Sequence, residues 1–114
     1  MLNQRHEVAQ AVAQELLPAE HDIDSAIVRN ARLMIAVIEG RKNARLPLAA
    51  GQEGLYLVAS ANARLVEARG LLVAAHTAFR KTQSEIGLDA FSYGDVALCP
   101  PSGQLQLVPA ANVA

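Results

Sequence analysis

The side chains that most often carry out chemistry are scattered along this sequence. Its three histidines, His6, His21 and His76, stand in three separate segments. No Glu-x-x-His and no His-x-x-x-His spacing occurs, although such pairs are what place two metal ligands on one helix face. We therefore expect no metal site and no other cofactor, and we interpret the acidic residues as surface and helix-capping groups.

Nucleophilic catalysis is not indicated either. Cys99 is the only cysteine, and it stands between Leu98 and Pro100 without a nearby histidine. A thiol needs a neighbouring base or positive charge to become a catalytic nucleophile, and an isolated cysteine usually behaves as a small hydrophobic residue. The segment Gly51-Gln52-Glu53-Gly54 lacks the Lys-Ser/Thr of a phosphate-binding loop. We predict that the protein is not an enzyme and has no catalytic residue.

The strongest candidate site is a row of polar residues spaced seven apart, which we call the polar rail: Asn62, Arg69, His76 and Gln83. On a helix this spacing puts all of them on one edge, at position e of a heptad repeat. Such residues set helix register and partner choice through hydrogen bonds. Alternatively, the rail lines a groove that binds a ligand or peptide, with His76 and Arg69 forming a patch suited to anions. The sequence leaves both interpretations open.

A long helix over residues 50–86 must position the rail, with Gly87 as its left-handed stop. Its positions a and d are apolar and alternate large with small side chains, which is typical of closely packed helices. We call the central part of this pattern the packing seam: Val58, Ala61, Leu65, Ala68, Leu72, Ala75 and Phe79.

The length of this helix bears on oligomeric state. Roughly 37 residues at about 1.5 Å each form a rod of roughly 55 Å, whereas a compact chain of this size is roughly 35 Å across. The sequence therefore predicts either a kink at Gly70 or a second chain that covers the excess. We favour a symmetric homodimer formed through this helix.

Two more helices are expected upstream. Val8, Val12 and Leu16 repeat every four residues in a segment over 3–17. Pro18 is expected either to end this helix or to start the next one. A second apolar stripe covers 22–45 and must end before Pro47. The acids at its start, Glu20, Asp22 and Asp24, are expected to cap the N-terminus of this helix. We predict an all-α class in which the segment over 22–45 and the long helix form an antiparallel hairpin. The shorter N-terminal helix packs against them, which gives a three-helix bundle over residues 1–88.

The last part of the chain, residues 89–114, differs from the rest. Pro100, Pro101, Gly103 and Pro109 break any helix there. Short apolar runs on both sides of Pro100–Gly103 predict either an extended tail or a small β-hairpin over 96–108.

Composition excludes several other classes. Hydrophobic residues make up 52% of the chain, but no run approaches the roughly 20 apolar residues of a membrane helix. We expect no membrane association and a cytoplasmic protein. Residues 1–40 carry three basic and six acidic side chains, a net charge of −3, and residues 41–88 carry seven basic and three acidic, a net charge of +4. The basic side chains gather in two distant clusters, so nucleic-acid binding is not expected.

These features together favour a non-enzymatic interaction or assembly protein, such as a helical adaptor or a small chaperone-like module. The alternative is a small-molecule-binding or regulatory helical bundle with its pocket between helices near His76 and Arg69.

Overall fold

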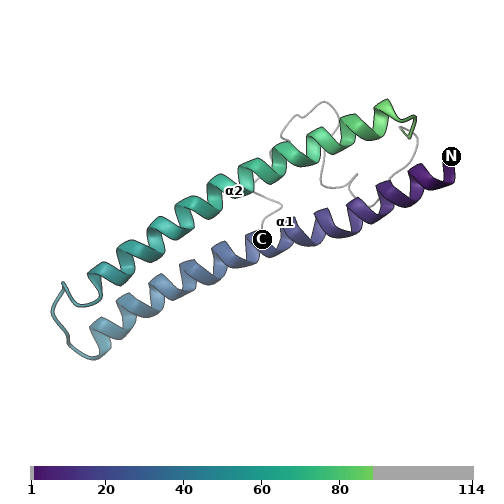
Figure 1. Cartoon of the computed structure of the whole chain (residues 1–114). Coiled ribbons are helices and arrows are strands. Elements are labelled where there is room, and N and C mark those ends of the chain that lie inside the picture. The colour runs from purple at the N-terminus through teal and green to yellow at the C-terminus, as the bar shows by residue number, and fades with distance from the viewer. Residues whose placement is uncertain (1, 89–114) are drawn as a thin grey trace, which may run out of the picture.

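The computed structural model describes residues 2–88 as two long helices that run antiparallel along each other (Figure 1). Helix α1 spans Leu2–Asn43 and helix α2 spans Gln52–Glu85. The described part of the chain is 66 Å long, close to the length of about 63 Å that α1 alone has at about 1.5 Å per residue. The described residues are therefore all-helical, as predicted, and the predicted strands at 96–108 lie outside them, as does Cys99.

The expectation of three helices is wrong at Pro18. This proline lies inside α1, which continues through it without a break. A proline removes one backbone hydrogen bond of the helix, but the packing stripe has the same spacing on both sides of it. Ala13, Leu16, Glu20 and Ile23 are all partly buried. Because α2 packs along the whole stripe, the two predicted segments form one helix and the bundle becomes a hairpin of two helices.

Replacing Pro18 with alanine is expected to stabilise the protein. Pro18 is exposed, so alanine removes no packing, while it restores the missing hydrogen bond and raises helix propensity. We expect the free energy of unfolding to rise by about 2 kcal/mol, measured by chemical denaturation followed by circular dichroism. A lower stability would show that the proline is needed to shape α1.

Helix α2 agrees closely with the segment predicted over 50–86, and it passes through Gly70 as a continuous helix. Helix α2 does not extend beyond the rest of the chain, because α1 is even longer and lies beside it for the whole distance. Length alone therefore requires neither a kink nor a second chain.

The turn between the helices is fixed by backbone conformation. Gly51 precedes α2 with φ of +79°, a left-handed conformation that side chains disfavour. A Cβ atom there would lie 3.1 Å from Cγ1 of Val37.

At the other end of the hairpin, Gly87 adopts φ of +83° just after α2, as predicted. There the Arg5 guanidinium donates a hydrogen bond to the carbonyl oxygen of Ile86, at 3.1 Å, which ties the start of α1 to the end of α2.

The contact between the helices is one side chain deep. Among residues 2–88, Leu88 and His76 are the side chains classed as buried, while the facing stripes of both helices are partly buried. Fifteen large hydrophobic residues of the same part are at least 36% exposed. The hairpin therefore has a packed interface between its helices but uncovered apolar surface on its outer sides.

Candidate interaction surface

Three of the four rail residues make hydrogen bonds to α1. The side-chain amide of Asn62 donates to the carbonyl oxygen of Ile27 at 3.3 Å. The Nε of Arg69 donates to Oδ1 of Asp24 at 2.6 Å. The Nδ1 of His76 lies 2.6 Å from Oε1 of Glu20. The rail therefore lies along the inter-helix contact.

Gln83, the fourth rail residue, completes the end of α2. Its side-chain amide donates a hydrogen bond to the carbonyl oxygen of Leu88 at 2.8 Å. This contact folds the chain back after the helix, and Leu88 is fully buried there. Gln83 thus acts at the open end of the hairpin.

His76 and Glu20 form the most enclosed polar contact between the helices. Only 5% of the His76 side chain and 24% of the Glu20 side chain are exposed. At this depth a hydrogen bond competes with little water, and losing one partner is costly. The pair therefore fixes α2 against α1 at one defined position.

Arg69 and Asp24 form a second inter-helix contact, but in a wetter place. Both side chains are 52% exposed. The hydrogen bond to Asp24, together with the charge of that carboxylate, raises the pKa of Arg69 above its ordinary value. Solvent and salt screen such an exposed pair, so it contributes little to the stability of the fold.

The contact with α1 is centred between positions a and e of α2, and not between a and d. The residues of the packing seam are therefore buried to different degrees. The a residues Val58, Leu65 and Leu72 are partly buried on the side facing α1. Of the small d residues, Ala68 and Ala75 are partly buried, whereas Ala61 is exposed. Phe79, at the open end, is 47% exposed.

The partners of the rail on α1 are the residues that the sequence did not reveal. Glu20 and Asp24 were expected to be acids at the start of a separate helix, because Pro18 precedes them. Their spacing of four places them on neighbouring turns of one helix face, which is the signal that was available. The spacing alone does not show which residues of α2 lie opposite Glu20 and Asp24.

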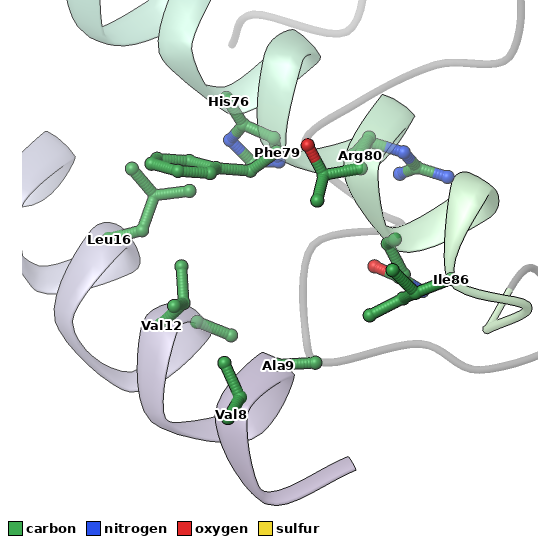
Figure 2. Close-up of a pocket in the computed structure, with 11 residues that line it drawn as sticks. Val8, Ala9, Val12, Leu16, His76, Phe79, Arg80 and Ile86 are labelled. Atoms are coloured by element: carbon green, nitrogen blue, oxygen red, sulfur yellow. The ribbon is translucent and has the colours of Figure 1, made fainter. Parts of the chain in front are cut away.

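A small cavity lies at the open end of the hairpin beside His76 (Figure 2). Its volume is about 100 Å³, below the roughly 300–1,000 Å³ of usual ligand pockets. Mostly apolar side chains line it, from α1 and from the last turns of α2: Val8, Ala9, Val12, Ala13, Leu16, His76, Phe79, Arg80, Thr82, Gln83 and Ile86. The cavity adjoins His76, but Arg69 is not among its lining residues.

An exposed face of α2 beside the contact with α1 carries a further regular pattern, which we call the outer stripe. Its residues are spaced three and four apart, carry no charge and are all exposed: Tyr56, Ala59, Ala63, Val66, Gly70, Val73 and Thr77. Val66 and Val73 are 56% and 54% exposed. This is the spacing of a second helix-packing seam, without a helix of the described chain to cover it.

Within residues 2–88, no group of three or more His, Cys, Asp or Glu side chains gathers as metal ligands do. Neither helix of that part combines the length and hydropathy that a membrane span requires. No protein-family model, curated protein or solved structure matches the chain.

Proposed function

We propose that this protein is a non-enzymatic interaction and assembly module, in the class of helical adaptors and small chaperone-like proteins, and that it forms a homodimer. One observation carries the proposal. In the part that the structure describes, a single hydrophobic side chain, Leu88, is buried, while fifteen large ones are at least 36% exposed.

Such a small amount of apolar burial within the hairpin favours a binding partner that covers the exposed apolar side chains. Ordering a residue costs about 1–2 kcal/mol in backbone entropy, and apolar burial is the main term that offsets it. Helices packed on one side only bury less apolar surface than the helices of a four-helix bundle, which surround a shared core. Exposed apolar patches larger than a few hundred Å² mark interaction surfaces in soluble proteins. A second helical surface on the hairpin would supply the missing burial.

Light scattering coupled to size-exclusion chromatography tests the dimer directly. We expect twice the monomer mass of 12.1 kDa. Between about 1 and about 100 µM protein, the melting temperature is expected to rise with concentration, because association stabilises the folded state by mass action. A monomer whose melting temperature is independent of concentration would contradict the homodimer.

The cavity beside His76 favours a second candidate function, the binding of a small apolar molecule. Replacing the partly buried Ala13, which lines the cavity, with phenylalanine would fill it. If this function is correct, the variant loses binding of an apolar fluorescent probe, measured by titration, while Ala11→Phe on the exposed face retains it. Equal binding by both variants would argue against a ligand site there.

A further inference from the structure

Gly70 is the feature of the outer stripe that packing within the chain does not explain. A glycine inside a helix costs about 1 kcal/mol relative to alanine, and usually persists where another backbone or side chain comes close. A Cβ atom added at Gly70 would meet nothing within 4 Å. Nothing in the hairpin itself therefore requires a residue without a side chain at this position.

We infer that the outer stripe of α2 packs against the same stripe of a second copy, with the two α2 helices antiparallel. The inference rests on the proposed function and specifies the surface, the occupant and the orientation. A two-fold axis beside residue 68 places both valines of the stripe opposite small residues. Val66 then lies opposite Gly70 of the partner subunit, and Val73 lies opposite the partner's Ala63. This is the large-to-small complementarity of close helix packing.

Charge favours the same arrangement. In this register Glu53, in the first turn of α2, lies beside the partner's Lys81, at the flanking positions where antiparallel helices form ion pairs. Lys81 is exposed, and its intrachain contact with Glu85 is long at 4.0 Å. In a parallel pair Glu53 and the partner's Lys81 would lie at opposite ends of α2, 28 residues or roughly 42 Å apart, so this ion pair would be lost.

One like-charge contact also arises near the axis, where Glu67 approaches the partner's Glu67. Glu67 is already bound by Arg64 of its own helix, with 3.2 Å between Nη1 and both carboxylate oxygens. The Glu67 side chain is 63% exposed, so solvent and salt screen the repulsion.

The distribution of charge along the whole hairpin also favours an antiparallel pair. Its turn half, residues 25–66, carries six basic and two acidic side chains, a net charge of +4. Its open half, residues 2–24 and 67–88, carries four basic and seven acidic, a net charge of −3. An antiparallel pair brings each turn half beside the open half of the other copy, whereas a parallel pair brings like halves together.

Gly70→Leu tests the surface. Leucine is a good helix former and has open space in the monomer, so helicity is expected to be kept. In the dimer the new side chain would occupy the place of the partner's Val66, and we expect the dissociation constant to rise at least about 100-fold. Gly54→Leu is the matched control, because Gly54 is also in α2, also has nothing within 4 Å, and lies outside the outer stripe.

Cross-linking tests the orientation in the full chain, with Cys99 replaced by serine. Glu53→Cys and Lys81→Cys proteins are mixed and treated with a short thiol cross-linker. Predominant cross-links between the two variants support the antiparallel pair. Predominant Glu53→Cys self-cross-links would overturn it, as would a Gly70→Leu variant that dimerises as strongly as Gly54→Leu. In both of these cases the dimer of the proposed function survives. A wild-type protein that is monomeric by light scattering would overturn both proposals.

Discussion

Replacing Leu72 with aspartate is expected to unfold the hairpin, whereas the same substitution at Leu71 leaves it folded. The two leucines are neighbours in α2, but Leu72 is partly buried on the side facing α1, while Leu71 is 72% exposed. A carboxylate at Leu72 loses the apolar contact and places a charge without a counterion between the helices. We expect a loss of about 3 kcal/mol in the free energy of unfolding.

Thermal unfolding followed by circular dichroism measures both variants. Because helix propensity and charge change equally in the two proteins, the comparison isolates the position of the side chain. Leu71→Asp is expected to melt close to the wild type. If Leu71→Asp is the more damaging substitution, α2 is rotated relative to the contact described above.

The second large effect is expected at the pair formed by His76 and Glu20. His76→Ala leaves the enclosed Glu20 carboxylate without its hydrogen bond to the imidazole, and we expect a loss of about 3 kcal/mol. Glu20→Ala should also be strongly destabilising. The double variant is expected to lose much less than the sum of the two, because each single substitution removes the same interaction.

The measurement is a double-mutant cycle by chemical denaturation. Its control is the corresponding cycle at Asp24 and Arg69, which join the same helices through a pair that is 52% exposed on both sides. Solvent screening should make the coupling there clearly smaller. Additive losses at Glu20 and His76 would mean that the two side chains stabilise the protein independently.

The sequence allowed α2 to be predicted almost completely, because its apolar residues repeat at helical spacing without interruption. The structure places this helix at Gln52–Glu85. At Pro18 the local signal was misleading. The intrinsic preference against proline is real, but it acts at one residue, whereas contacts with α2 along the whole of α1 hold the helix together. Tertiary packing therefore outweighed propensity.

The residues of α1 that bind the polar rail could not be predicted from the sequence, for a different reason. Periodicity identified Asn62, Arg69 and His76 as residues of one helix edge, but it does not state the alignment of two helices. Reading Glu20 and Asp24 as capping acids followed from the helix break expected at Pro18. Without that break, acids on one face of α1 would have been natural candidates to meet Arg69 and His76. An error in one element thus hid the contacts of another.

The polar contacts also determine how this hairpin is able to move. Sliding α2 by one heptad along α1 would bring His76 beside Ala13 and Arg69 beside Leu17, so both hydrogen bonds to the acids of α1 would be lost in a single step. Proteins that transmit signals by ratcheting one helix past another need two registers of similar energy. Here the enclosed contact between His76 and Glu20 makes the alternative register costly. The enclosed contact therefore opposes sliding between the helices, and it favours motions in which α1 and α2 move together over motions that change their register.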